Sequence, residues 1–187
     1  MPNRSATASI PASNEDALIG AGRKCFAEYG YAGSRLATIV NEVGVTTGAF
    51  YRRFASKADF FHALFVSYGE DLQAALAESE TLTDQFAAWI VVSREHRGVV
   101  HASMEMLHRD ATHATTRQRL RGLCAGLLAR HLEAELSWRD ARGAALTLSD
   151  ALDQYVLMET VGWIEEKDPL LVAANLNELV ERGLYGS

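Results

Sequence analysis

Proline is missing from one long stretch of this chain, and its absence constrains the fold strongly. The three prolines are Pro2, Pro11 and Pro169, so residues 12–168 contain none. Proline inside a helix removes a backbone hydrogen bond and clashes with the preceding turn, although it is tolerated in the first turn. The run at residues 89–92, Trp-Ile-Val-Val, has strand-like propensity, but neither turn residues nor polar alternation surround it. We therefore predict an all-α fold.

Apolar residues recur at i, i+3/i+4 and i+7, and the breaks between these runs predict about nine helices. Gly30 and Gly44 should end the first two helices, because glycine adopts the left-handed conformation found at helix C-termini. Asp168 should cap the last helix and Pro169 should begin it. The expected spans are about 13–30, 36–43, 46–54, 56–76, 82–95, 98–110, 114–137, 144–166 and 169–184.

The composition is that of an ordinary globular protein. The chain has 187 residues, of which 48% are hydrophobic and 22% are charged. Its uncharged apolar stretches are too short to span a bilayer, and its first residues lack the apolar core of a signal peptide. Cys25 and Cys124 lie far apart, which favours two free thiols in a reducing compartment. We expect a cytoplasmic protein with no membrane partner.

The net charge of −6 is distributed unevenly along the chain. Residues 1–57 contain seven Lys and Arg against four Asp and Glu, a balance of +3. The remaining residues contain eleven bases against twenty acids, a balance of −9. A uniformly acidic chain would not favour nucleic acid, but the N-terminal third is a candidate binder of polyanions.

Residues 39–54 read Ile-Val-Asn-Glu-Val-Gly-Val-Thr-Thr-Gly-Ala-Phe-Tyr-Arg-Arg-Phe. They combine a short helix, a turn at Gly44 and a second helix whose first turn is small and rich in hydroxyl groups. Glycine permits the sharp turn, and Val45 is placed to fill the angle between the helices. A small first turn lets the second helix enter a major groove closely, as in a helix-turn-helix. On spacing alone, a plain corner between two core helices fits equally well.

A wider pattern surrounds this segment. It comprises Ala21, Phe26, Gly30-Tyr31, Ile39, Gly44-Val45-Thr46, Gly48, Tyr51, Phe54 and Ser56-Lys57. In this spacing the residues, which span about a quarter of the chain, resemble the DNA-binding domain of tetracycline-repressor-type (TetR family) transcriptional regulators. Val40 and Val43 stand where the family usually has alanine, and Arg35 replaces a common small residue. The operator sequence therefore does not transfer from relatives.

The resemblance implies an N-terminal three-helix helix-turn-helix domain followed by a helical ligand-binding and dimerisation domain. The expected boundaries are 1–12 for a disordered arm, 13–57 for the DNA-binding domain and 58–187 for the C-terminal domain. The implied DNA-binding residues are Ser34, Arg35, Thr46, Thr47, Gly48, Ala49, Tyr51, Arg52 and Lys57. The first two and the last three would contact the DNA backbone, and those between would face base edges or phosphates. Gly48 would allow close approach, whereas Phe50 and Phe54 are expected in the core.

The family forms homodimers through its last two helices, which here are the expected spans 144–166 and 169–184. The residues implied for this interface are Leu148, Leu152, Val156, Leu171, Leu179 and Val180. Each of them is equally compatible with the core of a single chain.

The C-terminal domain of the family also binds a small molecule. The candidates for contacting such an effector are Phe86, Trp89, Met104, His108, Tyr155, Glu159 and Trp163. Aromatic and methionine side chains suit a mostly apolar cavity, although each taken singly also fits an ordinary core. Glu159 and His108 are polar groups on apolar helix faces, which require a partner. We expect an apolar or aromatic effector whose polar or cationic end binds Glu159.

The sequence shows no recognisable catalytic site. Its histidines lack the i, i+4 spacing of helical metal ligands, and no nucleophile, paired-carboxylate or phosphate-binding motif stands in convincing context. We expect no enzyme activity, metal or cofactor. The sequence predicts a homodimeric repressor that binds a palindromic site in double-stranded DNA and is released by an effector. A helical enzyme or carrier with a coincidental motif, and a DNA-binding factor without small-molecule control, remain the alternatives.

Overall fold

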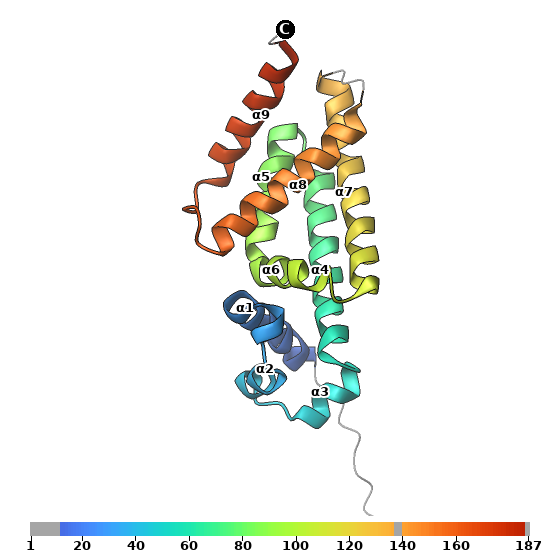
Figure 1. Ribbon diagram of the computed structural model, residues 1–187, viewed down its shortest axis with the longest axis vertical. Coiled ribbons are helices and arrows are strands. Elements are labelled where there is room, and N and C mark those ends of the chain that lie inside the picture. Colours follow the sequence, from blue (N-terminus) through green and yellow to red (C-terminus); the bar gives the residue numbers. More distant parts are fainter. Residues whose placement is uncertain (1–11, 137–139, 186–187) are drawn as a thin grey trace, which may run out of the picture.

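The structure is a computed structural model that describes residues 12–136 and 140–185 (Figure 1). These ranges contain nine α-helices and no strand, which confirms the predicted all-α fold. The helices are α1 (Ala12–Gly33), α2 (Leu36–Val43), α3 (Thr47–Arg53), α4 (Lys57–Glu78), α5 (Leu82–Glu95), α6 (Arg97–Met106), α7 (Ala111–Leu136), α8 (Ala141–Thr160) and α9 (Pro169–Tyr185). The arm predicted at residues 1–12 lies outside the described residues, apart from Ala12.

Helix boundaries in the C-terminal half differ from those expected, because turns and caps shift them. The helix predicted over 144–166 ends at Thr160. Gly162 adopts a left-handed conformation (φ 76°), and its amide donates to the Glu159 carbonyl at 3.0 Å. α7 begins three residues earlier than expected, since the Asp110 carboxylate accepts a hydrogen bond from the His113 amide at 3.0 Å. α6 ends at Met106 rather than near residue 110.

An aromatic core joins α1 and α3 to the start of α4. The rings of Phe26 and Phe61 meet edge to face with 5.6 Å between their centroids. Phe50 and Phe54 pack on Phe60 at 5.4 and 4.9 Å. All five side chains are at most 3% exposed, so each contributes about 1.5–3 kcal/mol to stability. The expected core positions of Phe50 and Phe54 are thus confirmed.

α4 connects this N-terminal cluster to the C-terminal bundle (Figure 1). Its 22 residues make a helix about 33 Å long. The Ser56 hydroxyl accepts a hydrogen bond from the Asp59 amide at 3.0 Å and so caps its start. Phe60 in its first turn belongs to the aromatic core, and Leu76 near its end is buried in the bundle. One continuous helix therefore serves both halves of the molecule.

α6 lies between the bundle and α1 and is in very close contact with α1 (Figure 1). A Cβ atom at Gly98 would overlap the Arg23 carbonyl oxygen and lie 2.5 Å from the Ala27 amide nitrogen. Further along α6, the Glu105 carboxylate accepts hydrogen bonds from the amides of Tyr31 and Ala32 at 2.8 and 3.0 Å. The backbone of α1 is thereby held against α6 at two points.

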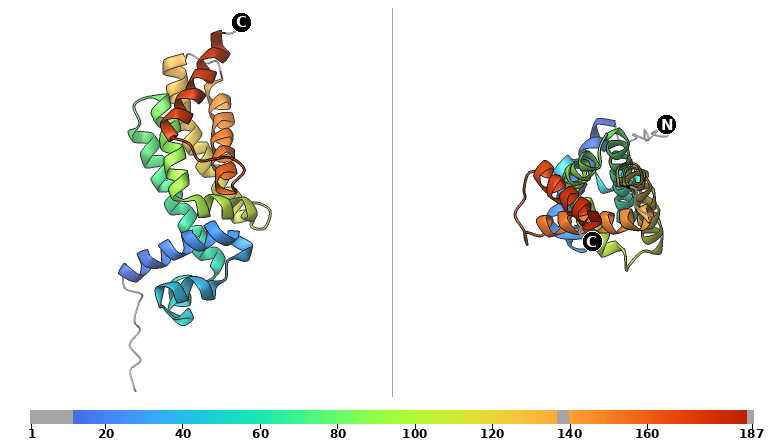
Figure 2. Two further views of the ribbon diagram at one scale, coloured as in Figure 1. Left: turned by 90° about the vertical axis from the view of Figure 1, so that its left-hand side faces the viewer. Right: turned by 90° about the horizontal axis from the view of Figure 1, so that it is seen from above.

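The two last helices pack differently. α8 lies against α7 and α5, whereas α9 rests chiefly on α5 at the edge of the bundle (Figure 2). Residues 161–168 connect them without helical structure. Within the described ranges, none of the helices combines the length and apolar character that crossing a membrane requires.

Candidate DNA-binding surface and effector cavity

The turn between α2 and α3 has helix-turn-helix geometry. Gly44 adopts a left-handed conformation (φ 71°, ψ 21°), and its amide donates to the carbonyls of Val40 and Asn41. The Val45 amide donates to the Val40 carbonyl at 3.0 Å, and the Val45 side chain packs against the core. Because a Cβ atom strains the left-handed conformation, Gly44 fixes how α3 leaves α2.

The first turn of α3 presents a small exposed surface. Thr46, Thr47 and Gly48 are exposed and Ala49 is half-buried. The Thr46 hydroxyl oxygen accepts a hydrogen bond from the Ala49 amide at 3.1 Å, which caps α3. A Cβ atom at Gly48 would meet only the Thr46 hydroxyl oxygen, at 3.9 Å. The fold itself does not require glycine at position 48, so the surface is open to an external partner.

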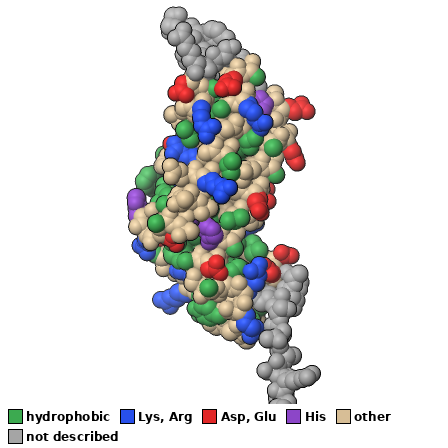
Figure 3. Space-filling view, turned by 90° about the vertical axis from the view of Figure 1, so that its right-hand side faces the viewer, with side chains coloured by type: hydrophobic (Ala, Val, Ile, Leu, Met, Phe, Trp, Pro, Cys, Tyr) green, Lys and Arg blue, Asp and Glu red, His purple; other side chains and the backbone are tan. Residues whose placement is uncertain are grey.

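Cationic and phenolic side chains surround this turn. Arg35, Tyr51 and Arg52 are exposed, and Figure 3 shows Lys and Arg side chains on this end of the molecule. The Arg53 guanidinium instead donates to the Glu15 carboxylate from Nε at 3.1 Å and Nη2 at 2.9 Å. Arg53, which is also exposed, therefore fastens α3 to α1.

Two of the predicted DNA contacts have structural roles instead. Ser34 is 3% exposed, and its hydroxyl donates to the carbonyls of Cys25 and Gly30 at 3.0 and 2.6 Å. Lys57 Nζ donates to the carbonyls of Tyr31 and Ser34 at 2.8 and 2.9 Å. Burial lowers the pKa of the Lys57 ammonium. Both residues hold the turn between α1 and α2 in this structure, and their contacts with DNA stay a prediction.

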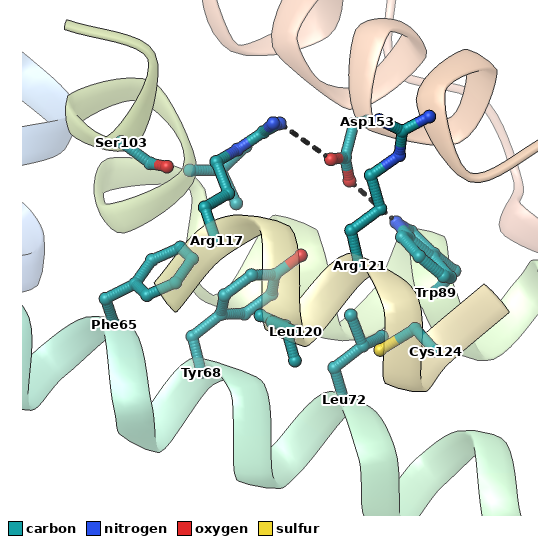
Figure 4. A pocket seen from close by; sticks show the side chains of 11 residues that line it. Phe65, Tyr68, Leu72, Trp89, Ser103, Arg117, Leu120, Arg121, Cys124 and Asp153 are labelled. Atoms are coloured by element: carbon teal, nitrogen blue, oxygen red, sulfur yellow. Dashed lines mark hydrogen bonds and ion pairs between the residues drawn. The ribbon is translucent and has the colours of Figure 1, made fainter. Parts of the chain in front are cut away.

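A narrow cavity of about 20 Å³ lies inside the C-terminal bundle (Figure 4). Its volume suffices for about one water molecule. The lining side chains come from α4 to α8 and are Phe65, Tyr68, Leu72, Trp89, Val100, Ser103, Arg117, Leu120, Arg121, Cys124 and Asp153. Aromatic and aliphatic surfaces thus meet a small group of charged side chains at one point, which is the usual make-up of a ligand site.

Asp153 forms the polar side of this cavity. Its Oδ2 accepts a hydrogen bond from Arg117 Nη2 at 2.9 Å, and its Oδ1 accepts one from Trp89 Nε1 at 3.0 Å (Figure 4). Burial raises the pKa of Asp153, while the Arg117 charge and the Trp89 bond act in the opposite direction. Burial also raises the pKa of Cys124 to about 12, so this thiol stays protonated and unreactive.

The sequence that builds the N-terminal cluster is shared with known proteins. Residues 18–64 match the model of the tetR family of bacterial regulatory proteins. Over these residues the chain is similar to the tetR family. The HTH-type transcriptional repressor KstR2 of Mycolicibacterium smegmatis is 31% identical over 103 residues, which cover 50% of this chain and 50% of that protein. The match therefore spans about half the length of this curated relative.

Solved structures with the same fold span almost the entire chain. A tetR-family regulatory protein from Rhodococcus RHA1 superposes with a TM-score of 0.76 at 18% identity and covers 93% of this chain and 98% of its own. The FadR regulator of Bacillus subtilis, solved with stearoyl-CoA, gives a TM-score of 0.70 at 18% identity over 90% of this chain and 98% of its own. At such low identity these likenesses concern the fold.

The seven residues predicted to hold an effector do not line one common cavity. Trp89 lines the central cavity and Phe86 lies in the core. Met104 and Tyr155 border two separate grooves, and Glu159 is paired with Arg94. His108 and Trp163 are exposed. In this structure these residues therefore do not form a single site, and their contact with an effector stays a prediction. Because α6 and α8 end earlier than expected, His108 and Trp163 lie outside the helices that would have aimed them inward.

Glu159 is engaged by the protein rather than available to an effector. Its carboxylate accepts hydrogen bonds from Arg94 Nε at 2.9 Å and Nη2 at 2.7 Å, and Arg94 Nη2 also donates to the Lys167 carbonyl at 2.7 Å. Burial acts to raise the pKa of Glu159, but the hydrogen bonds and charge of Arg94, together with the neighbouring Tyr155 side chain, outweigh it and lower that pKa. The pair fastens the end of α8 and the following connection to α5.

The residues implied for a dimer interface fall into two groups. Leu152, Val156 and Val180 are buried within the single chain at 1%, 0% and 7% exposure, so they belong to its core in this structure, and their part in an interface stays a prediction. Leu171 and Leu179 are exposed at 54% and 69%, whereas Leu148 is half-buried. Sequence periodicity does not separate these groups, because α9 carries apolar residues both on its buried face and on its exposed face.

Arg117 and Asp153 are not among the residues predicted from the sequence. Asp153 follows the buried Leu152 on a largely apolar helix, so the argument applied to Glu159 would have singled it out. Arg117 stands in the polar run Thr-Thr-Arg-Gln-Arg, which looks like a solvent-exposed face. Within residues 12–136 and 140–185, no three His, Cys, Asp or Glu side chains are grouped in a way that could hold a metal ion.

Proposed function

We propose that this chain is a DNA-binding transcriptional regulator under small-molecule control, and that it acts as a repressor in the cytoplasm, where the chromosome is accessible. Residues 13–57 would bind DNA, and residues 58–187 would bind the effector and a second copy of the chain. The match of residues 18–64 to the family model supports a helix-turn-helix that functions in DNA binding over a coincidental one. The residues proposed to contact DNA are Arg35, Thr46, Thr47, Gly48, Ala49, Tyr51 and Arg52.

The observation that carries this proposal is the position of α6 between the two functional parts. Val100 and Ser103 of α6 line the central cavity, while Gly98 and Glu105 of the same helix contact α1. A ligand larger than the cavity must displace its walls, and any shift of α6 is passed directly to the backbone of α1. Coupling between such sites typically amounts to about 1–3 kcal/mol, which corresponds to a change in affinity of about 5–150-fold.

We expect Gly48→Gln to abolish specific DNA binding while the protein stays folded. The side chain has space within the chain but would stand between α3 and the floor of a major groove. Fluorescence anisotropy with DNA from beside the protein's own gene should show an affinity loss of about 100-fold, toward non-specific binding. Gly20→Gln, on an exposed open position of α1, is the matched control and should bind normally. Equal affinities for the two variants would argue against α3 as the recognition helix.

We also propose a homodimer that presents two recognition helices to successive major grooves, about 34–36 Å apart, on a palindromic site. Exposed apolar side chains of Leu170, Leu171 and Leu179 on α9, and of Trp163 before it, support this assignment. The double variant Leu171→Glu/Leu179→Glu should sediment as a monomer at micromolar concentration, since it places two charges in the contact. Leu123→Glu changes a leucine on α7 that is 49% exposed, and it should leave the dimer intact; a monomeric wild-type chain would exclude this interface.

One observation favours a second candidate function, a DNA-binding factor without small-molecule control. The central cavity holds about 20 Å³, far less than a typical ligand pocket of about 300–1,000 Å³. If the cavity never widens, the C-terminal bundle serves only for dimerisation. Whether the side chains that line the cavity can move apart to admit a ligand distinguishes the two candidate functions.

A further inference from the structure

Two larger grooves flank the central cavity, and each is separated from it by a few side chains. A groove of about 370 Å³ runs between α4 and α7 and shares Phe65 and Leu120 with the cavity. Another groove, of about 210 Å³, lies among α6, α7 and α8 and shares Arg117 and Asp153 with it. The cavity is therefore a narrow junction between the two grooves. Phe65 and Leu120 separate it from the first groove and form its apolar partition; Arg117 and Asp153, with the neighbouring Arg121, form its charged partition.

The apolar partition depends on Gly69. A Cβ atom there would lie only 3.0 Å from Leu120 Cδ1, so the absence of a side chain gives Leu120 its place. Beyond Leu120, the groove between α4 and α7 carries the exposed side chains of Val66 and Leu123. Hydrophobic side chains lie among charged ones on this face of the bundle (Figure 3). A change of the Leu120 rotamer would join the groove to the cavity, and the groove alone has the volume of a small-molecule site.

The two arginines of the charged partition have guanidinium N–H groups that the carboxylates of Asp153 and Asp150 do not use. Each guanidinium has five N–H groups, yet the bonds from Arg117 to Asp153 and from Arg121 to Asp150 and the Leu146 carbonyl use Nη2 alone. Arg121 Nε is buried and has no hydrogen-bond partner among the described residues. Such surplus donors suit a planar anion, which guanidinium groups bind with two parallel hydrogen bonds.

Asp153 is the residue of the charged partition whose carboxylate a bound anion could replace as the partner of Arg117. Burial raises the pKa of its carboxyl group, so neutralising it by a proton is easier than for an exposed aspartate. Aromatic rings and Asp153 together would also suit a cation. However, Asp153 already accepts two hydrogen bonds, and a cation beside it would face Arg117.

We propose that the effector is an elongated amphiphile with an anionic head, of which a medium-chain carboxylate is the simplest example. The head binds Arg117 and Arg121 in place of the Asp153 carboxylate, and the apolar chain passes Leu120 into the groove between α4 and α7. This inference rests on the proposed control by a small molecule and names the class of that molecule. Filling the junction presses on Val100 and Ser103 of α6, the helix that holds α1.

Three ten-carbon probes of different charge test the proposal by isothermal titration of the full chain below their micelle concentrations. Decanoate should bind, and 1-decanol and decyltrimethylammonium should bind at least about tenfold more weakly. Asp153→Asn keeps an acceptor for Trp89 Nε1 but removes the competing charge, so it should bind decanoate about tenfold more tightly. Glu178→Gln, which removes a surface carboxylate on α9, is the matched control and should change nothing.

The role of the guanidinium is tested separately, because Arg117→Met leaves Asp153 without its cation and threatens folding. The double variant Arg117→Met/Asp153→Leu removes both charges; it should melt near the wild type and lose decanoate binding by tenfold or more. Decanoate binding retained by this variant, or preference of the wild type for decyltrimethylammonium, would overturn the anionic head. Decanoate that binds without releasing bound DNA would overturn effector control and leave the site standing, whereas a chain that binds no DNA refutes the proposed function alone.

Discussion

Gly98→Ala is expected to destabilise this protein more than any other change of a single methyl group. The new Cβ atom would overlap the Arg23 carbonyl oxygen and press on Ala27, and both contacts are with the backbone of α1. Backbone atoms of a packed helix cannot move aside as a side chain can, so α6 must separate from α1. Overpacking of this kind costs about 3 kcal/mol, which corresponds to a decrease in Tm of about 6–12 °C for a chain of this size.

Gly20→Ala is the matched control for this prediction, since position 20 lies on α1 with no atom within 4 Å of an added Cβ. Alanine there should stabilise the helix by up to about 1 kcal/mol. The folded fraction of Gly98→Ala should also bind DNA without responding to an effector, because α6 no longer holds α1. A Tm for Gly98→Ala equal to that of Gly20→Ala would show that the two helices do not need close contact.

Local signals explain why most of the fold could be predicted. The conformations of Gly30 and Gly44, the cap at Thr46 and the start of α9 at Pro169 depend on residues a few positions away. The end of α8 could not be predicted in this way, because apolar residues continue past Gly162 at helical spacing. There the Arg94 side chain from α5 binds the Lys167 carbonyl, and this long-range contact favours a turn over further helix.

The functional residues likewise divide into those indicated by local sequence and those that depend on long-range contacts. Thr46, Thr47 and Gly48 form an exposed turn whose character is evident from their small side chains. Lys57, by contrast, has the same sequence signature as a phosphate contact, and only its bonds to carbonyls of a distant turn show its structural role. The central cavity needs side chains from five helices, so periodicity along any one helix could not locate it.

Arg94→Met should be the most destabilising replacement of a charged residue, because it leaves Glu159 buried without a cation. The side chains of Arg94 and Glu159 are only 11% and 4% exposed. Breaking such a pair from one side costs about 3–5 kcal/mol, whereas replacing both members by apolar residues is often neutral. Urea unfolding should therefore show a large loss for Arg94→Met and recovery of most of it in Arg94→Met/Glu159→Met. Arg182→Met, which breaks a surface pair with Glu178, should change stability by less than about 1 kcal/mol.

The pH dependence of this loss follows from the pKa of Glu159. In the wild type that pKa lies below its usual value, so the pair contributes stability above the unfolded pKa and loses it as the pH falls through the folded pKa. In Arg94→Met the hydrogen bonds that lower the pKa of Glu159 are gone, and burial alone raises that pKa. The effect of pH on stability therefore changes sign, because the buried carboxyl group is tolerated when protonated and destabilises the fold as the pH rises. The stability difference between wild type and Arg94→Met should consequently be larger at pH 8 than at pH 5. A difference that does not change with pH would mean that Glu159 is hydrated in the variant and that the connection between α8 and α9 has detached from α5.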